Sequence, residues 1–336
     1  MKHKLSLILL ILITCIPLWG CGKEPVTQTG IYFDTVISIT IYDTSKENLI
    51  NDCFNKCREY ENLFSKTSPD SELYKLNNGL LTATKQTDTE ISYQISPELA
   101  YLIESGLMYS EMSGGLFDIT ISPLSDLWNF HSDSEEALAV PDSTDIESAC
   151  QKVDYTKVSI EDNVITLKRD SASDSWPTID LGALAKGYIA DELAAYLKHN
   201  DCQSALINLG GNIMCIGEKE KDTPFTLGIQ KPFGNGNEHL TTVEVRDASV
   251  VTSGNYERYF MENDKLYHHI LNPKTGYPFE NDLNSVTIIC ESSLKADALS
   301  TICFALGAEK GMELINNTEG VKAIFVDKDN NLNYSY

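Results

Sequence analysis

The stretch Ile179–Asp191, IDLGALAKGYIAD, is the segment around which the rest of the chain is expected to fold. The apolar residues Ile179 and Leu181 flank Asp180, as at the end of a half-buried strand, and the glycine that follows permits a sharp turn. From Ala183 onward the sequence is rich in strong helix formers. The segment therefore predicts a strand that turns directly into a helix.

A strand–turn–helix joint of this kind can bind an anion. The first backbone N–H groups of a helix have no partner within the helix, and the helix dipole is positive at that end. Lys186, one turn into the predicted helix, adds a positive charge, and Asp180 can bind a hydroxyl, an amide or a metal-bound water. The alternative is a joint that only turns the chain, as many do.

Length and charge limit the classes of function. The 336 residues are enough for one large domain or two interlocked ones with a full core. The formal net charge is −23, and no basic stripe is visible in the sequence that could neutralise phosphates. We therefore expect no nucleic-acid partner and no direct electrostatic binding to anionic lipid.

The N-terminus has the pattern of an export signal: MKHK is basic, and the LSLILLILITCIPLW that follows is apolar. With a glycine before Cys21 and Leu18 three positions ahead of it, the junction resembles a bacterial lipobox. We expect a lipoprotein signal peptide over 1–20, a lipidated Cys21 with a polar tether over 21–30, and one folded domain over 31–336. The protein would then sit on the extracytoplasmic face of the cell membrane, attached through the lipid only. An ordinary cleaved signal peptide and an uncleaved anchor are the alternatives.

The cysteine count does not predict a disulfide framework. Without Cys15 and Cys21, seven cysteines remain, at positions 53, 57, 150, 202, 215, 290 and 303. An odd number cannot be fully paired, and most of the seven have apolar neighbours. We interpret them as small core residues, although a disulfide remains possible in an exported protein.

The first third of the chain alternates strand and helix signals. Residues 31–42 predict one strand with three isoleucines on one face. The sequence TSKE at Thr44–Glu47 predicts a capping box for the next helix, whose apolar stripe over 49–64 is typical of a core-facing helix.

The next helix is predicted to begin at Ser96-Pro97 and to end at Gly114-Gly115. The two glycines would let the backbone pass close to a flat ligand, on which Phe117 could stack. Alternatively, Phe117 packs in the core at the start of a strand over Phe117–Ile121. A hairpin is predicted further on, around Asp162-Asn163.

The C-terminal third contains the polar residues that suggest chemistry. A predicted strand ends at Thr252-Ser253-Gly254, and His268 and His269 follow on another strand end. Asp297 and Thr301 are four residues apart on a predicted helix, so they share one face. Their hard oxygen atoms suit Mg²⁺, although a solvated Asp and a Thr bonded to its own helix are the simpler alternative.

Three short patterns also suggest a serine β-lactamase or penicillin-binding protein: Ser292 with Lys295, Ser253-Gly254-Asn255, and Lys274-Thr275-Gly276. Their order along the chain is wrong for that class. Lys274-Thr275-Gly276 also lies between two prolines, which predicts a turn and not the core strand that the class requires.

Six further motifs, in this order, resemble those of the ApbE family of FAD:protein FMN transferases. They are Gly114-Gly115 with Phe117-Asp118; Asp180–Ala183 with Ala185–Tyr188; Asn208–Asn212; Thr252–Gly254; His269-Ile270 with Pro273 and Thr275-Gly276; and Ala296–Ala298 with Thr301. Each motif is weak alone, but six in the family's order are specific, and they span nearly everything after the tether. A lipobox also fits, since many members are exported lipoproteins.

The resemblance implies an α+β fold of two similar intertwined halves with the flavin nucleotide in the cleft between them. It implies an enzyme that uses Mg²⁺ to split the diphosphate of FAD, attaches FMN to a Thr or Ser hydroxyl of an acceptor flavoprotein, and releases AMP. Acceptors would be subunits of membrane redox complexes or extracellular electron-transfer proteins. Hydrolysis of FAD to free FMN and AMP, or flavin binding without turnover, are the alternatives.

The resemblance also implies the residues of the site. Asp297, Thr301 and the backbone carbonyl of Ala183 would bind the metal, while Ser300 stands where some members have a second acidic ligand. The positions that would contact FAD are Phe33, Leu116, Phe117, Asp118, Asp180, Lys186 and Ile270. Phe33 departs from the family pattern, because other members often have methionine there.

The acceptor hydroxyl needs a general base. His269 is the first candidate, because the unperturbed pKa of histidine, about 6.5, lies near neutral pH. His268 and Asp297 are the alternatives, and His269 could instead pack against the ligand without a proton role.

Overall fold

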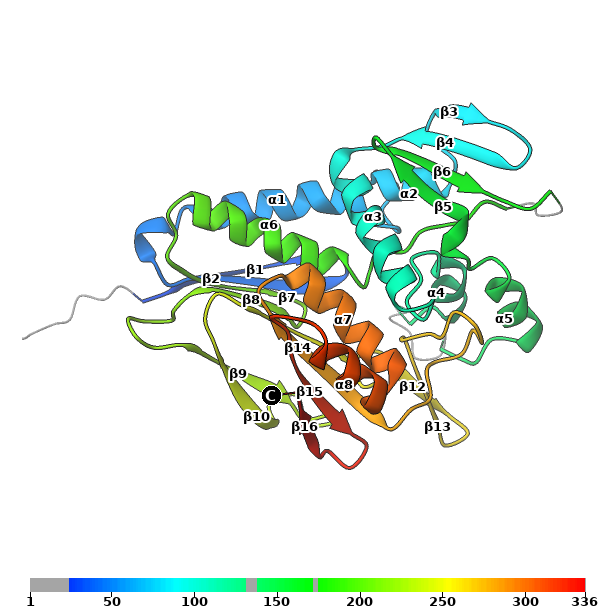
Figure 1. Ribbon diagram of the computed structural model, residues 1–336. Coiled ribbons are helices and arrows are strands. Elements are labelled where there is room, and N and C mark those ends of the chain that lie inside the picture. Colours follow the sequence, from blue (N-terminus) through cyan, green and yellow to red (C-terminus); the bar gives the residue numbers. More distant parts are fainter. Residues whose placement is uncertain (1–23, 131–137, 172–174, 336) are drawn as a thin grey trace, which may run out of the picture.

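Antiparallel strand pairing organises the computed structural model, which describes residues 24–130, 138–171 and 175–335 (Figure 1). Within those residues the larger sheet has eight strands, and each neighbouring pair is antiparallel. Their spatial order is β1 (Val26–Tyr32), β2 (Thr35–Ile41), β7 (Ser204–Leu209), β8 (Asn212–Gly217), β11 (Ser249–Gly254), β14 (Leu283–Cys290), β15 (Lys322–Asp327) and β16 (Leu332–Tyr334). The N-terminal hairpin thus joins the same sheet as strands from the C-terminal third.

The remaining strands form three smaller sheets. They are β3 (Ala83–Gln86), β4 (Glu90–Gln94), β6 (Val164–Lys168) and β5 (Val158–Glu161) in that order; β9 (Phe225–Gln230) with β10 (His239–Val245); and β12 (Tyr259–Glu262) with β13 (Lys265–His268). The helices are α1 (Leu49–Phe64), α2 (Glu72–Asn77), α3 (Pro97–Met112), α4 (Ser122–Trp128), α5 (Ser143–Cys150), α6 (Ala185–His199), α7 (Ser293–Leu306) and α8 (Ala308–Asn316). This mixture confirms the expected α+β class.

The larger sheet is covered on both faces (Figure 1). Apolar side chains of β2 and β7 pack with those of α1 and α6, and the C-terminal strands pack against α7 and α8. The β9–β10 pair covers the opposite face, where its apolar residues cluster with Val250 and Ile324. Burial on both faces explains why β14 is a nearly continuous run of buried residues and does not alternate.

Several predicted elements are confirmed. The apolar stripe of α1 is buried, and Ser96 caps α3, with its Oγ accepting a hydrogen bond from the N–H of Leu99 at 3.4 Å. The hairpin of β5 and β6 turns at Asp162-Asn163, both with positive φ. All seven cysteines of the described residues are free, and six of them are buried, as expected for core residues. Lys274-Thr275-Gly276 lies in a turn.

The predicted start of the folded domain is wrong. The expected single strand over 31–42 is two strands, because Phe33 and Asp34 form a tight turn at φ values of 52° and 55°. The first strand begins at Val26, inside the expected tether over 21–30. The polar composition of that stretch reflects its place at the edge of the sheet, where its Thr and Gln side chains are exposed.

Two helix starts also differ from prediction. The TSKE sequence forms no capping box: Asp43 accepts a hydrogen bond from the N–H of Ser45 in a short 3₁₀ turn, and α1 begins only at Leu49. The helix expected from Ala183 begins at Ala185, after a turn.

The two short strands predicted at Phe117–Ile121 and at Ile179–Leu181 do not form: the first stretch is bend and turn, and the second has no regular structure. A single backbone hydrogen bond of 2.7 Å links them, from the N–H of Asp180 to the carbonyl of Ile119. Ile179 is held by the amide side chain of Asn77, which bonds both its N–H and its carbonyl at 2.8 Å. The Asn77 side chain therefore makes the hydrogen bonds that a neighbouring strand would otherwise make to Ile179. A hydrophobic pattern in the sequence does not reveal such a contact.

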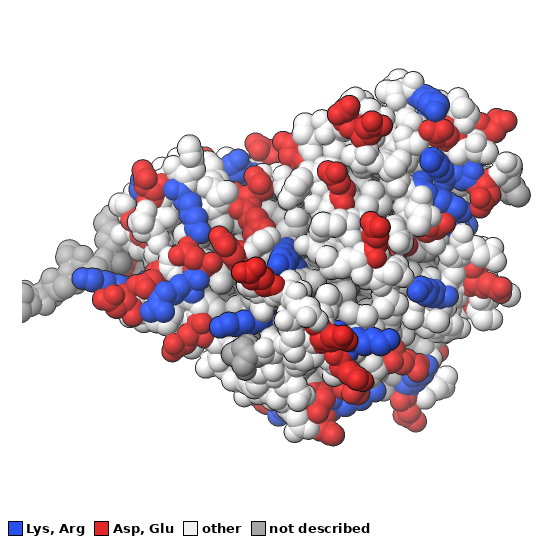
Figure 2. Space-filling view, viewed as in Figure 1, with Lys and Arg blue, Asp and Glu red and all other residues white. Residues whose placement is uncertain are grey.

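No helix of the described residues is long and apolar enough to cross a membrane. The predicted signal peptide and Cys21 lie outside those residues. Figure 2 shows acidic and basic side chains interspersed over the viewed face, with no continuous basic stripe on it.

Candidate active site

The site is built where α6 and α7 cross at Gly187. A Cβ atom at this position would lie 2.5 Å from the carbonyl oxygen of Ser293 and 2.7 Å from Cα of Leu294. Only glycine lets the two backbones approach this closely. The glycine of the AKGY sequence thus brings the start of α6 against α7.

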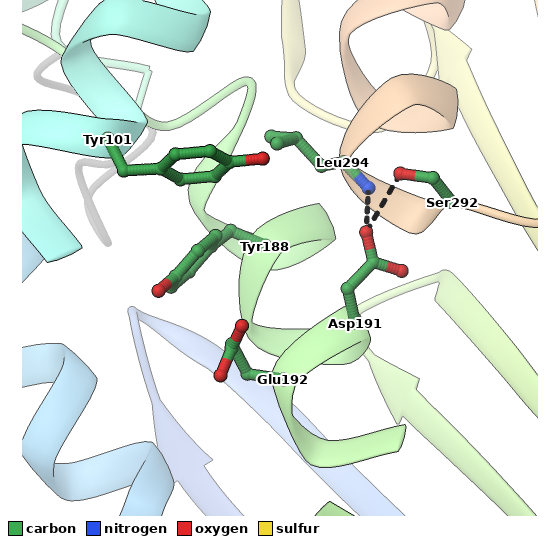
Figure 3. Close-up of a pocket in the computed structure, with 6 residues that line it drawn as sticks. All are labelled: Tyr101, Tyr188, Asp191, Glu192, Ser292 and Leu294. Carbon is green, nitrogen blue, oxygen red and sulfur yellow. Dashed lines mark hydrogen bonds between the residues drawn. The ribbon is translucent and has the colours of Figure 1, made fainter. Parts of the chain in front are cut away.

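Two carboxylates link these helices reciprocally. Asp191 on α6 accepts hydrogen bonds from the Ser292 hydroxyl and the N–H of Leu294, at 2.9 and 3.0 Å (Figure 3). It also accepts one from the N–H of Ser293, at 2.7 Å. Asp297 on α7 in turn accepts a 2.9 Å bond from the N–H of Gly187. Each carboxylate therefore satisfies N–H groups in the first turn of the other helix, which fixes their relative positions.

A cavity of about 320 Å³ lies beside the first of these links. Tyr101, Tyr188 and Glu192 line it together with Asp191, Ser292 and Leu294 (Figure 3). None of the predicted flavin or metal residues is among these six, so the cavity is separate from the predicted site.

The predicted metal ligands fit a hard cation. Asp297 is only 4% exposed, and the Oγ1 of Thr301, one turn further along α7, lies 3.1 Å from the Oγ of Ser253. Ser253 also lies 2.8 Å from the hydroxyl of Ser300, which donates to the Asp297 carbonyl. The motif ending β11 and the motif on α7 thus meet in a cluster of oxygen atoms.

The carbonyl of Ala183 fits the same role. In a regular helix it would accept the N–H of Gly187, but that N–H bonds Asp297, and no hydrogen bond to this carbonyl is found among the described residues. The set has one carboxylate, and no cluster of three His, Cys, Asp or Glu suited to a metal occurs in the described part of the chain. Neutral oxygens with a single carboxylate suit Mg²⁺ that is also bound by a phosphate.

Lys186 lies at the edge of this cluster. Its Nζ is 3.8 Å from the Oδ2 of Asp297 and donates a 3.0 Å hydrogen bond to the carbonyl of Gly182. The lysine therefore places a positive charge at the start of α6, as the sequence predicts.

Asp180 is held as a carboxylate by Lys66. The two form an ion pair of 2.8 Å, and Asp180 also accepts hydrogen bonds from Ser125 and Gly182. Burial opposes its ionisation, but the lysine and these hydrogen bonds outweigh burial and lower the pKa of Asp180 to about 2. Lys66 was not identified from the sequence, because it lies in a polar loop with no periodic pattern. Asp191 lies at the end of the segment from which the sequence was interpreted, but no role was predicted for it, because its partners Ser292–Leu294 are about 100 residues away in the sequence.

The segment Leu116–Asp118 faces inward more than predicted. The Phe117 ring is buried and packs edge-on against Tyr109 at 6.5 Å, which favours the core alternative for this side chain. Asp118 accepts hydrogen bonds from Thr120 and from the backbone N–H of Tyr155, so its carboxylate is already occupied. Contact between this segment and flavin stays a prediction, as it does for Phe33 at the hairpin turn and for buried Ile270.

The hydrogen bonds of the two histidines assign them different roles. His268 uses both ring nitrogens: Nε2 lies 3.0 Å from the Phe279 carbonyl, and Nδ1 accepts the N–H of Ile270 at 3.3 Å. His269 Nδ1 lies 3.3 Å from the Arg258 carbonyl, so it carries the proton and leaves a lone pair on Nε2. This geometry disfavours His268 as the base and favours His269.

Burial lowers the pKa of both histidines, to about 4 for His268 and about 3 for His269, where His268 and Arg258 add repulsion. Both rings are therefore neutral at neutral pH. A pKa this low makes the ring of His269 a weak base, so the geometry of Nδ1 and Nε2, and not a near-neutral pKa, is what favours this residue.

Sequence comparison decides the family. The family model described as the ApbE family matches residues 33–325. The chain belongs to the ApbE family. An FAD:protein FMN transferase of Klebsiella pneumoniae (strain 342) is 34% identical over 308 residues, 91% of this chain and 90% of that protein. One of Treponema pallidum (strain Nichols) is 35% identical over 290 residues, 83% of this chain and 77% of that protein.

Solved structures of ApbE proteins share the fold. The ApbE protein of Thermotoga maritima superposes with a TM-score of 0.80 at 26% identity, covering 93% of this chain and 97% of its own. Flavinyl transferase ApbE of Pseudomonas stutzeri, in its apo form, gives a TM-score of 0.74 at 27% identity, covering 91% and 92%. The predicted family and its fold are thus confirmed.

Proposed function

We propose that this enzyme, an FAD:protein FMN transferase by family and by its curated relatives, uses Mg²⁺ to move FMN from FAD to a Thr or Ser hydroxyl of an acceptor flavoprotein, releasing AMP. The observation that carries this proposal is the placement of Asp297 and Thr301 one turn apart on α7, with Lys186 Nζ 3.8 Å from the Asp297 carboxylate. The Ala183 carbonyl, which no hydrogen bond among the described residues occupies, precedes Lys186 by three residues. A charged diphosphate needs such a combination of cation sites to be cleaved.

In the proposed reaction the acceptor hydroxyl oxygen attacks the FMN-side phosphorus of FAD. The bond from that phosphorus to the bridging oxygen breaks, and AMP leaves with the bridging oxygen. The Nε2 lone pair of His269 takes the hydroxyl proton, while the Lys186 ammonium group neutralises phosphate charge.

Mg²⁺ held by Asp297, Thr301 and the Ala183 carbonyl would neutralise the charge that develops on the diphosphate. Asp297 is the only carboxylate of this set, and the Gly187 N–H keeps it aimed at the start of α6. With Ser300 where some members have an acidic ligand, the protein alone binds the cation weakly, and bound FAD completes the site.

Removal of the carboxylate tests the metal assignment. The Asp297→Ala variant should release AMP from FAD at least about 100-fold more slowly at any Mg²⁺ concentration, because the cation loses its charged ligand. AMP formation is followed by chromatography. The control variant Asp145→Ala removes an exposed carboxylate from α5 and should behave as wild type. Wild-type turnover by Asp297→Ala at saturating FAD would refute the assignment.

The proposed location is the extracytoplasmic face of the cell membrane, with Cys21 lipidated. The basic and apolar N-terminus before the Gly20-Cys21 junction supports this proposal. The acceptor would be a flavoprotein on that side of the membrane, either a subunit of a membrane redox complex or an extracellular electron-transfer protein.

A further inference from the structure

Lys66 joins three elements around one carboxylate. It lies in the loop between α1 and α2, and its Nζ is 2.8 Å from the Oδ2 of Asp180, in the segment before α6. On α4, the Oγ of Ser125 and the Oδ1 of Asp126 lie 2.6 and 2.7 Å from the same nitrogen. An ammonium group has three hydrogens, so these three partners use all of them.

The loop that carries Lys66 is fixed by its own hydrogen bonds. The Oγ of Ser65 accepts the N–H groups of Thr67 and Ser68 at 3.3 and 3.0 Å. The Ser71 hydroxyl donates to the carbonyl of the same serine. The Lys66 side chain itself is only 15% exposed. The lysine is therefore held in place by the fold, without help from a ligand.

The backbone beside Asp180 is fixed from the same side of the molecule. Asn77, at the end of α2, bonds both the N–H and the carbonyl of Ile179 at 2.8 Å. The N–H of Asp180 bonds the carbonyl of Ile119 at 2.7 Å. Both the backbone and the side chain at this position are thus constrained.

Most of the lone pairs of the Asp180 carboxylate are already in use. A carboxylate offers about four positions to donors. Lys66 and Ser125 occupy those of Oδ2, and the N–H of Gly182 takes one on Oδ1 at 2.9 Å. Among the described residues no other donor reaches Oδ1, and the side chain is 16% exposed. One position on Oδ1 is therefore left for a ligand.

Charge decides which part of FAD can use that position. Lys66 has no hydrogen left for a phosphate, and a carboxylate repels one. The diphosphate is therefore expected at Lys186, and Asp180 accepts from an uncharged N–H or O–H group. FAD has such donors in the flavin ring, in the adenine amino group and in its hydroxyl groups.

We propose that Lys66 is a positioning residue for FAD: it fixes the Asp180 carboxylate as the acceptor for an uncharged N–H or O–H donor of the dinucleotide. This inference rests on the proposed function, because it takes FAD as the ligand and Asp180 as a contact. Lys66 touches neither FAD nor the reacting phosphates. It therefore contributes to FAD affinity and not to the cleavage step.

Equilibrium binding tests the proposal. FAD is titrated into the protein without Mg²⁺, with flavin fluorescence as the signal, so no turnover is needed. Lys66→Met should raise the dissociation constant of FAD about tenfold, because a charge-assisted hydrogen bond loses its fixed acceptor. At saturating FAD and Mg²⁺, kcat for AMP release should stay within about twofold, since cleavage proceeds at other groups. Thermal unfolding verifies the fold, and Lys66→Gln replaces Lys66→Met if that variant does not fold.

Two further variants test whether the lysine acts through Asp180. Asp180→Asn should raise the dissociation constant of FAD by a similar factor. Adding Lys66→Met to Asp180→Asn should cause little further loss, because the lysine then has no carboxylate to position. Lys66→Arg keeps the charge and should recover most of the affinity.

The matched control removes another lysine that forms a short ion pair. Lys198, in the last turn of α6, lies 2.9 Å from Asp247. Lys198→Met should leave the dissociation constant of FAD within about twofold of wild type, since this pair lies at the opposite end of α6 from Asp180.

The outcomes separate this inference from the proposed function. Wild-type FAD affinity in folded Lys66→Met or in Asp180→Asn would overturn the positioning role while the transferase stands. Independent, multiplying losses in the double variant would overturn it as well. A wild-type enzyme that binds FAD but attaches no FMN to an acceptor would instead contradict the proposed function and leave the binding role of Lys66 in place.

Discussion

At the scale of single residues, hydrogen bonds separate two adjacent histidines that the sequence does not distinguish. His268 has both ring nitrogens occupied and its ring edge-on to Phe304, so its part is structural. The carbonyl of Arg258 orients His269 and leaves Nε2 available. The assignment of the base therefore depends on backbone carbonyls, which no sequence motif encodes.

The His269→Ala variant should transfer FMN at least about 100-fold more slowly, with FAD affinity nearly unchanged, because only the proton acceptor is lost. Because burial lowers the pKa of His269 to about 3, the residue is already neutral at pH 5, and kcat/KM should not follow a pKa of 6.5. Transfer rates measured from pH 5 to 8 check both points. Normal transfer by the variant across that range would place the base elsewhere.

His268 should contribute to acid sensitivity of the fold. Its folded pKa, about 4, lies below that of an exposed histidine, so the unfolded chain binds the proton first as pH falls below 6.5. This residue alone should cost about 1.5 kcal/mol of unfolding free energy between pH 6.5 and pH 5. Urea unfolding of the wild type and of His268→Gln at both pH values measures this loss of unfolding free energy. An equal acid loss in His268→Gln would show that other groups cause the effect.

At the scale of elements, the contact of α6 with α7 positions the residues of the proposed metal site. The sequence predicts both helices, and it places Lys186, Asp297 and Thr301 on them. It does not show that Gly187 is the crossing point, because a glycine within a helix gives no information about which element packs there.

The Gly187→Ala variant tests this crossing. The added methyl group would meet the backbone of Ser293 and Leu294, so the unfolding free energy should fall by about 1–3 kcal/mol and FAD cleavage should be lost at low Mg²⁺. Ala195→Ser, on the exposed side of the same helix, is the control. Wild-type stability and Mg²⁺ dependence in Gly187→Ala would mean that the helices do not meet at this residue.

Elements with a clear period were predicted well, and elements held by side chains were not. The apolar stripe of α1 and the cap of α3 are both visible in sequence. The extended chain around Ile179 is held by the Asn77 amide, a partner 102 residues away, and Asp180 is held by Lys66. Partners so far apart in the sequence leave no local pattern. The sequence therefore did not reveal that Lys66 pairs with Asp180 or that Asp191 links α6 to α7.

At the scale of the whole molecule, the proposed membrane attachment concerns Cys21 and the residues before it, which lie outside the described structure. The Cys21→Ala variant should remain unlipidated, because it lacks the thiol that would carry the lipid. Mass spectrometry of the N-terminal peptide measures lipidation, and cell fractionation measures whether the protein is in the membrane fraction. A variant still carrying a diacyl group would refute the lipobox assignment.

The topology of the larger sheet brings together motifs from distant parts of the chain. The larger sheet joins the N-terminal hairpin with the C-terminal strands, and the segment inserted between β2 and β7 provides α6. The proposed transfer of FMN needs this whole arrangement, since the proposed base, the proposed metal ligands and Lys186 come from different elements.

The most direct test of that claim is one reaction, in which the protein without its signal and lipid is incubated with FAD, Mg²⁺ and an acceptor flavoprotein. The products are separated and weighed by mass spectrometry. The account predicts AMP and an acceptor heavier by the mass of FMN less water, with the flavin on a Thr or Ser. AMP together with free FMN, and an acceptor of unchanged mass, would contradict it and identify the enzyme as a hydrolase of FAD.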